Sequence, residues 1–462
     1  SVRQFTHENS TASREYTEVE NGIKTCMYAG YPDLYMQFSK ANNFVFQPDW
    51  YRGVEYPKEQ ERGYASNEDL YVPGYFEMDI KKGETIVFSA STSACKTGGL
   101  KRLFDKEVDE RSPRDNFFHC LVNAAHQFHN RTSKDERYLL AGYPWFKCRA
   151  RDTFIALPGL TLSIEEEDYF ELVMQTASRG LYEFMEGKPL TTKIYEIEQP
   201  DVLLWAVWAV QQYAKHVGRD KCNRKYGKLV QDIVAYIVAD KHPNLHLMDN
   251  GLLYSEGKDK AVTWMNSTAN GRPVVPRTGY IVEFNALWYN ALKFCASMAT
   301  ESAHYEKRAD LCRNSFLDTF VNQYGYLFDY VEPLDSPDWS VRPNMIFAVA
   351  LDYSPLTPAQ QKSVLDVCTR ELLTPKGLRS LSPKSGGYNP MYVGPQTQRD
   401  YAYHQGTAWP WLGGFYMEAC LKIYKRTRLS FIERQMVGYE DEMTQHCLGT
   451  IPELFDGNPP FH

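Results

Sequence analysis

The sequence predicts a mainly α-helical protein, an (α/α)6 toroidal barrel that follows an antiparallel β-rich region resembling part of a β-sandwich. Residues 1–97 carry short, roughly alternating aromatic and β-branched segments, which are typical of antiparallel strands. From about residue 100 onward, apolar residues recur at i, i+3 and i+4, the spacing of amphipathic helices. The helical part shows no sequence repeat of roughly 30 to 50 residues, so a barrel is favoured over a solenoid.

The β-rich region contains four candidate strands separated by Pro, Gly and charged turns such as KKGE. They are LYMQFS (34–39), NFVFQ (43–47), LYVPGYFEMDI (70–80) and ETIVFSAST (84–92). Their short lengths and the turn residues between them predict antiparallel pairing. We therefore place a first domain at residues 1–97.

The second domain, residues 98–462, contains eleven segments with helical periodicity. They cover 115–129, 151–162, 165–185, 201–217, 221–240, 282–298, 301–321, 343–351, 358–373, 406–424 and 428–447. Six helix pairs would need a twelfth helix, which is missing from the pattern or replaced by residues 101–112. The chain is therefore expected to be a piece of a longer protein.

Two long connections interrupt the helices, at residues 241–281 and 374–405. Loops of this length in a compact domain are usually functional or disordered. Both are rich in Gly, Pro, Asn, Tyr and Arg, which favours ordered loops. We expect both to lie at one rim of the barrel.

The composition excludes several classes of function. The net charge is −7 and no run of five Lys or Arg occurs, so no nucleic-acid partner is expected. No stretch of 18 apolar residues occurs, so no membrane partner is expected. The ten cysteines include no CxxC pair and are expected to be reduced, which favours the cytoplasm. The P-loop, GxGxxG, GxSxG and HExxH patterns are missing, so no cofactor or metal is expected.

Aromatic residues make up 14% of the chain, and a minority of them lie on the predicted rim loops beside carboxylates, Arg and His. These loops supply four clusters of candidate residues. The clusters are Trp145, Arg151 and Asp152; Trp264, Asn266, Arg277 and Glu283; His404, Gln405 and Trp409; and Glu453. Each residue alone could cap a helix, lie in solvent or pack over the end of the barrel. Together they suit glycoside hydrolysis, in which two carboxyl groups flank the scissile bond.

Six segments occur in an order that carries a family resemblance. They are AGYPWFKCRARDTFIALPGL (141–160), TWMNSTANGRPVVPRTGYIVEFNALWYNAL (263–292), VRPNMIFAVAL (341–351), LLTPKGLRSLSP (372–383), RDYAYHQGTAWPWLGGF (399–415) and PELFDG (452–457). This series resembles the C-terminal half of glycogen debranching enzymes, which carries the amylo-α-1,6-glucosidase activity. Residues 1–95 resemble the β-sandwich region that precedes the barrel in bacterial members.

The resemblance implies a glycoside hydrolase of glycogen catabolism that cleaves α-1,6 branch points with inversion. Its expected partners are glycogen, limit dextrin and branched maltooligosaccharides. In barrels of this type the acid follows the fifth helix and the base follows the eleventh. Glu453 in PELFDG matches the base position. A phosphorolytic reaction is disfavoured, because the rim loops carry no basic phosphate cluster.

The sequence departs from the family at the acid position. The family motif reads TWMD, whereas this chain reads TWMN and places Asn266 there. A carboxamide cannot protonate a leaving oxygen at neutral pH. Three interpretations follow: an acid on the same loop substitutes (Asp249, Glu256 or Asp259), Asp201 in EQPDVLLW is recruited, or the domain binds α-glucan with little or no cleavage.

The expected glucose pocket consists of Trp145, Arg151, Asp152, His404, Gln405 and Trp409. Glu453 is expected to activate water. Arg277 and Glu283 are expected to form a supporting ion pair or to bind sugar hydroxyls.

Overall fold

The computed structural model describes residues 5–142, 146–334 and 336–462. The chain divides into two compact units, one of Ser1–Arg114 with Gly394–Gln396 and one of Asp115–Val393 with Thr397–His462. The units therefore divide after Arg114, whereas the sequence pattern places the domain boundary after residue 97. The interval contains helix α2 (Leu100–Glu110).

The first unit consists mainly of antiparallel strands. A four-stranded sheet has the order β1 (Tyr16–Val19), β2 (Gly22–Thr25), β3 (Leu34–Phe38) and β6 (Phe88–Ser91). A separate long hairpin pairs β4 (Asn43–Glu55) with β5 (Asn67–Glu77). Its register shifts between Phe46 and Asp49, which accommodates Pro48 in the strand. This antiparallel region confirms the β-rich prediction.

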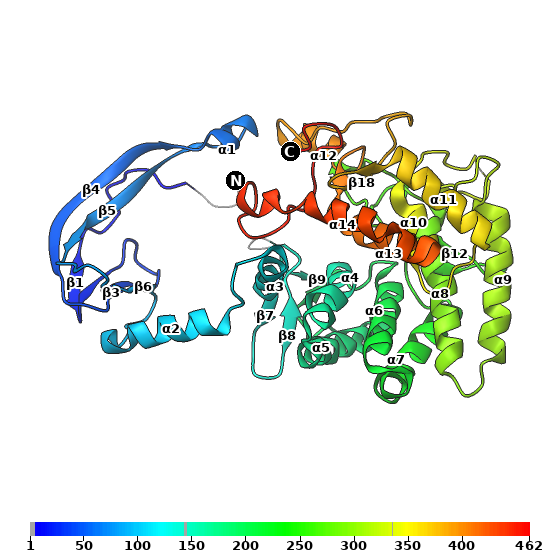
Figure 1. Ribbon diagram of the computed structural model, residues 1–462, viewed down its shortest axis with the longest axis horizontal. Coiled ribbons are helices and arrows are strands. Elements are labelled where there is room, and N and C mark those ends of the chain that lie inside the picture. Colours follow the sequence, from blue (N-terminus) through cyan, green and yellow to red (C-terminus); the bar gives the residue numbers. More distant parts are fainter. Residues whose placement is uncertain (1–4, 143–145, 335) are drawn as a thin grey trace. The chain divides into compact units, whose positions relative to one another are not determined.

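The second unit contains every one of the eleven predicted helical segments (Figure 1). The helices are α3 (Phe117–Gln127), α4 (Ala150–Leu160), α5 (Glu167–Met185), α6 (Val202–Val217), α7 (Arg219–Val238), α8 (Val282–Met298), α9 (Ala303–Phe320), α10 (Ile346–Ala350), α11 (Pro358–Glu371), α13 (Pro410–Tyr424) and α14 (Leu429–Val437). A short helix, α12 (Gln396–Ala402), lies within the second long connection.

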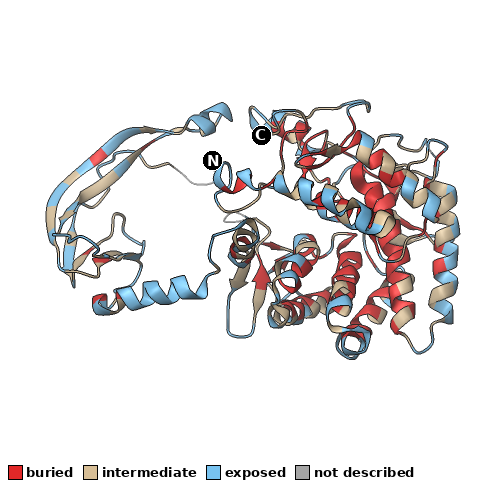
Figure 2. Cartoon of the chain, in the orientation of Figure 1, coloured by how far each residue is buried: buried red, intermediate tan, exposed pale blue. Residues whose placement is uncertain are grey.

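Burial separates these helices into an inner and an outer set (Figure 2). Helices α6, α8 and α10 are buried around most of their circumference, and contacts run in series from α4 through α6, α8 and α10 to α13. Helices α7, α9, α11 and α14 each bury one stripe and expose the remainder. A helix that is apolar all round is a core helix. The inner set is therefore α4, α6, α8, α10 and α13.

The long connections contain short strands that the sequence pattern does not predict. The first forms most of a sheet with the order β11 (His246–Leu247), β12 (Leu253–Ser255), β15 (Gly279–Ile281) and β16 (Tyr330–Val331). The second contributes to the sheet β17 (Leu373–Thr374), β18 (Gly377–Arg379) and β19 (Ala408–Trp409). Strands of two or three residues carry no detectable alternation. They hold the long connections in fixed conformations.

The alternation of inner and outer helices makes every inner helix begin at the same end of the barrel. Helices α4, α6, α8 and α13 begin directly after or at the predicted site residues. The long connections lead into these starts, so the candidate site lies at this end. No helix in the described part of the chain is both long and apolar enough to cross a membrane.

Candidate active site

The first part of the site joins the starts of α4 and α6. Arg151, in the first turn of α4, donates from Nε to Oδ2 of Asp201 at 2.7 Å and from Nη2 to Oδ1 at 2.8 Å. Asp201 precedes α6, is 2% exposed and also accepts from Trp205 Nε1 at 3.2 Å. Such a bidentate pair is strong and directional. It fixes the first turn of α4, which carries Asp152.

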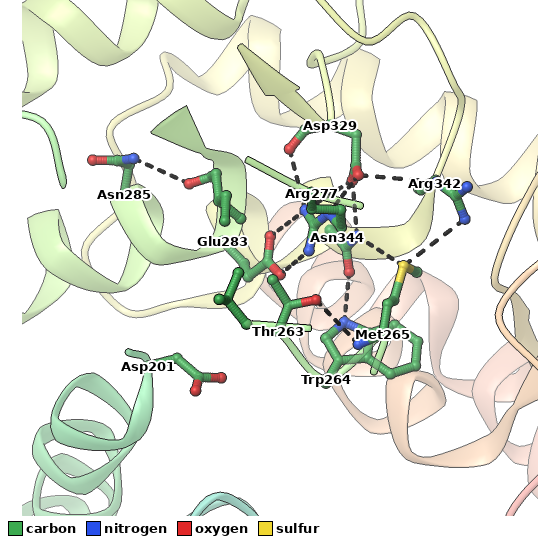
Figure 3. A network of polar contacts seen from close by, with 12 residues as sticks. Asp201, Thr263, Trp264, Met265, Arg277, Glu283, Asn285, Asp329, Arg342 and Asn344 are labelled. Atoms are coloured by element: carbon green, nitrogen blue, oxygen red, sulfur yellow. Dashed lines mark hydrogen bonds and ion pairs between the residues drawn. The ribbon is translucent and has the colours of Figure 1, made fainter. Parts of the chain in front are cut away.

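The second part is a buried ion network around Arg277 (Figure 3). Arg277 donates to both carboxylate oxygens of Glu283 at the start of α8, with the Nη2–Oε2 contact at 2.6 Å. It also donates from Nε to Oδ2 of Asp329 at 2.6 Å. All three side chains are almost fully buried. The ion pair expected between Arg277 and Glu283 is therefore present, with Asp329 as a second acidic partner.

Hydrogen bonds extend this network toward the aromatic residues. Asn344 donates from Nδ2 to Asp329 Oδ1 at 2.8 Å and accepts from Trp264 Nε1 at 2.7 Å (Figure 3). Arg342 donates to the carbonyl oxygen of His404 at 2.8 Å and to Oε1 of Gln405 at 2.6 Å. Both residues lie just before α10. They link the predicted residues of one long connection to those of the other.

An aromatic cluster forms where the two long connections meet. The His404 ring stacks on Trp409, with centroids 5.1 Å apart and planes 16° apart. The Trp264 ring meets His404, Trp409 and Trp411 edge to face, at 5.2, 5.3 and 5.2 Å. Tyr403 packs on His404 at 4.6 Å. The expectation that the two connections share one rim agrees with these contacts.

His404 is neutral in this environment. Burial lowers the pKa of His404 well below its ordinary value, and the Arg342 and Arg277 guanidinium groups lower it further. Its Nδ1 accepts from the backbone N–H of Ser267 at 3.4 Å, which assigns the ring proton to Nε2. That Nε2 is buried and has no hydrogen-bond partner among the described residues.

The segment that carries Glu453 is fastened to this cluster through its backbone. Phe455 and Ala408 exchange hydrogen bonds of 2.8 and 2.9 Å, and Gly457 N–H donates to the Pro390 carbonyl at 2.8 Å. A Cβ atom at Gly457 would lie 1.8 Å from the Gly406 carbonyl oxygen, so only glycine fits. Since Ala408 adjoins Trp409, this anchoring brings Glu453 to the aromatic cluster.

Glu453 and Asp152 are exposed carboxyl groups that interact electrostatically. Partial dehydration by the surrounding protein raises the pKa of Glu453, a hydrogen bond from Tyr403 lowers it, and the Asp152 charge raises it again. Dehydration likewise raises the pKa of Asp152, against the Arg151 and Arg149 charges. Two accessible carboxyl groups with raised pKa values that interact electrostatically are candidates for acid–base chemistry.

Asn266 follows the buried Trp264 and Met265 and is itself half-buried. Its side chain makes no hydrogen bond within the described ranges. The three acids considered as substitutes on this connection are exposed, and Glu256 accepts from Thr278 at 3.1 Å. They are Asp249, Glu256 and Asp259.

Sequence reasoning placed nearly every polar position of this end but missed three. Asp329, Arg342 and Asn344 were given no role, although each contacts at least one predicted residue: Arg277, His404 and Trp264, respectively. Arg342 and Asn344 flank a proline at the entry to an apolar helix, which is a signal in the sequence, whereas Asp329 has no such signal. Trp145 lies outside the described residues. No group of three His, Cys, Asp or Glu is arranged to hold a metal in the described part of the chain.

Comparison with known proteins agrees with this architecture. The family described as "Amylo-alpha-1,6-glucosidase" matches residues 122–462, and "Glycogen debranching enzyme N terminal" matches residues 1–87. The chain belongs to the glycogen debranching enzyme family. The glycogen debranching enzyme of Saccharomyces cerevisiae is 25% identical in an alignment of 235 residues, and the match covers 40% of this chain. The match covers only 15% of the length of the yeast relative.

Solved structures show the same fold at low sequence identity. A bacterial glucoamylase complexed with acarbose has a TM-score of 0.55 and 14% identity, covering 95% of this chain and 69% of that one. A GH63 mannosylglycerate hydrolase from Thermus thermophilus complexed with glucose has a TM-score of 0.53 and 12% identity, covering 73% and 94%. This debranching-family chain therefore has the six-hairpin glycosidase fold with an N-terminal antiparallel β region.

Proposed function

We propose that this chain binds the α-1,6 branch of an α-glucan at the barrel end and hydrolyses it slowly, with inversion of configuration. The observation that carries the proposal is the electrostatic pairing of Glu453 with Asp152 beside Tyr403. Family membership supplies the substrate class, which is glycogen, limit dextrin or branched maltooligosaccharide. The reaction needs water and these side chains only.

Glu453 is the proposed base. Its carboxylate is exposed and can therefore contact a water molecule. A raised pKa makes the carboxylate a stronger base, and the Tyr403 hydrogen bond favours its charged form. In the proposed step the carboxylate removes a proton from water while the water oxygen attacks the anomeric carbon. The bond between that carbon and O6 breaks, and the leaving O6 takes its proton from solvent water.

Asn266 occupies the position expected to protonate the leaving oxygen. Its amide can donate a hydrogen bond to that oxygen but cannot transfer a proton at neutral pH. The loss of a general acid lowers a rate by roughly 10²–10⁴-fold. Slow hydrolysis is therefore proposed. Asp201 is assigned to holding Arg151, because both of its carboxylate oxygens already accept from that guanidinium.

The proposed glucose pocket combines Asp152, the His404 Nε2 donor and the Trp409 ring, with Trp145 added from the family pattern. Neutral His404 carries a proton on Nε2 that lacks a partner, which a sugar hydroxyl would supply. Arg342 orients Gln405 by donating to its Oε1 at 2.6 Å. The amide nitrogen of Gln405 is then left to donate to the substrate. Arg277, Glu283 and Asn344 hold this wall without touching sugar.

A second candidate function follows from the same asparagine. A chain without the acid could serve as an α-glucan-binding homologue with no measurable cleavage. The two functions share the pocket and differ only in turnover.

One experiment tests the proposal and separates the two functions. Glucose release from a 6-O-α-glucosyl maltooligosaccharide is followed by proton NMR, which identifies the anomer first formed. We expect slow release of β-glucose by the natural sequence and none by Glu453→Gln, with equal substrate binding by both. Binding without release supports the second candidate. Release of α-glucose refutes inversion, and equal measurable rates for both proteins refute the assignment of Glu453 as the base.

A further inference from the structure

A groove of about 700 Å³ lies between helices α5 and α7. It shares no residue with the site described above. This volume is within the range of small-molecule sites, roughly 300–1,000 Å³. Its lining includes Leu172, Tyr182 and Leu229, while exposed Gln175 and Lys225 border it. The groove thus offers apolar patches and polar edges on the surface of the barrel.

Three of the four charged residues that line the groove are paired, and the fourth, Asp168, is exposed at its edge. Lys225 pairs with Glu171, and Lys228 pairs with Asp232 at 2.8 Å. The Tyr182 hydroxyl also donates to Asp232, at 3.0 Å. Because the paired charges compensate one another and no unpaired cation lines the groove, it suits a neutral ligand rather than an anionic one.

Two hydroxyl groups of the groove have no such partners. The oxygens of Ser178 and Tyr226 are buried and form no hydrogen bond among the residues that the structure describes. Tyr226 is only 6% exposed, and burial raises its pKa, so its hydroxyl stays protonated and able to donate. Buried hydroxyls of folded proteins are normally hydrogen-bonded. One water molecule occupies only about 30 Å³, far less than this groove.

We propose that the groove binds a linear α-1,4-glucan segment, whose sugar hydroxyls pair with Tyr226 and Ser178. The leucine and tyrosine side chains would cover the apolar faces of the glucose units. The choice of glucan rests on the proposed function, since a polymeric substrate extends beyond the catalytic end. A second attachment point raises the overall affinity for a polymer without changing the chemistry at the first.

The test compares the natural chain with the double variant Tyr226→Phe/Ser178→Ala, which removes only two oxygen atoms. Retardation in glycogen-containing native gels reports polymer binding. Glucose release from a 6-O-α-glucosyl maltotriose reports the catalytic end. The control Tyr416→Phe removes a tyrosine hydroxyl that is 2.8 Å from Thr369 and lies away from the groove.

We expect the double variant to bind glycogen about tenfold more weakly, with two- to tenfold lost per hydrogen bond. Its release of glucose from the short substrate and its Tm should match those of the natural chain. Unchanged glycogen affinity in the folded double variant overturns the proposal. If the natural chain and both variants neither cleave nor bind the short substrate, the proposed function is refuted. The comparison of glycogen binding still tests the groove in that case.

A crystal of the natural chain soaked in maltoheptaose gives an independent answer. Glucose units between α5 and α7, within hydrogen-bond distance of the Tyr226 hydroxyl, are expected. An empty groove beside an occupied catalytic end overturns the proposal even where the variant is unstable.

Discussion

At the scale of single residues, the environment of Glu453 combines opposing effects. Dehydration and the Asp152 charge both raise its pKa, whereas the Tyr403 hydroxyl lowers it. The same burial and the Glu453 charge raise the pKa of Tyr403, so this hydroxyl remains a donor. A base with a raised pKa is stronger but must still be ionised to act. In the proposed mechanism Tyr403 is therefore a positioning residue that lowers the pKa of Glu453.

Substitution Tyr403→Phe should move the acid limb of the kcat/KM profile to higher pH. Removing the hydrogen bond destabilises the charged carboxylate and raises the pKa of Glu453, so ionisation needs a higher pH. The measurement is glucose release against pH, made in the Asn266→Asp background for adequate signal. Tyr388→Phe is the control, because its hydroxyl donates to Asn458 rather than to Glu453. An acid limb that stays in place or moves lower contradicts the assignment.

At the scale of elements, backbone contacts hold the segment that carries Glu453 in place. Phe455 and Ala408 form a β-bridge. Gly457 lies so close to the Gly406 carbonyl oxygen that position 457 has no space for a side chain. Position is critical here, because a shift of about 1 Å can cost roughly 100-fold in rate.

Substitution Gly457→Ala should lower kcat roughly 10- to 100-fold, because the new methyl group must displace the segment that carries Glu453. The assay is glucose release in the Asn266→Asp background, with circular dichroism to verify folding. Gly414→Ala serves as the matched control, since an added Cβ on that exposed helical glycine meets nothing within 4 Å. Equal activity of the two variants would show that the loop position is unimportant.

The ion network around Arg277 ties the first long connection to α8 and β16. Substitution Arg277→Met leaves the buried Glu283 carboxylate without a cation and Asp329 with only the more distant Arg342, whose Nε lies 3.9 Å from Oδ2. Breaking a buried pair in this way costs about 3–5 kcal/mol of the free energy of unfolding. Urea unfolding measures the loss.

Lys362→Met provides the comparison, because Lys362 is 55% exposed and pairs with Asp366 at the surface. That substitution should cost less than about 1 kcal/mol. Similar small losses for both variants would mean that the Arg277 network contributes little to stability.

The elements that sequence predicts well are those with a strong period. The interior helix α8 and the outer helix α9 were both identified, since their apolar residues recur over four or more turns. Strands such as β13 (Thr268–Ala269) and β18 are too short to show any period. Asp329 was missed because its role depends on Arg277, which lies 52 positions away in the sequence. Such partners follow from the tertiary fold and not from local pattern.

At the scale of the whole barrel, the hairpin arrangement explains why distant segments contribute to one site. Each inner helix begins at the same end, and the helix starts carry Arg151, Asp201, Glu283 and Trp409. The N-terminal end of a helix carries partial positive charge and favours acidic side chains. A ring of such starts can therefore hold several carboxylates in one place, which suits hydrolysis of a glycosidic bond.

The central claim is that this site is a debranching glucosidase in which an amide replaces the general acid. The rate of glucose release from 6-O-α-glucosyl maltotriose by the natural chain and by Asn266→Asp tests this claim most directly. Restoring the acid should raise the rate roughly 10²–10⁴-fold, and adding Glu453→Gln should abolish the gain. A natural chain that is already fast and is slowed by Asn266→Asp would contradict the account, as would an Asn266→Asp protein that releases no glucose.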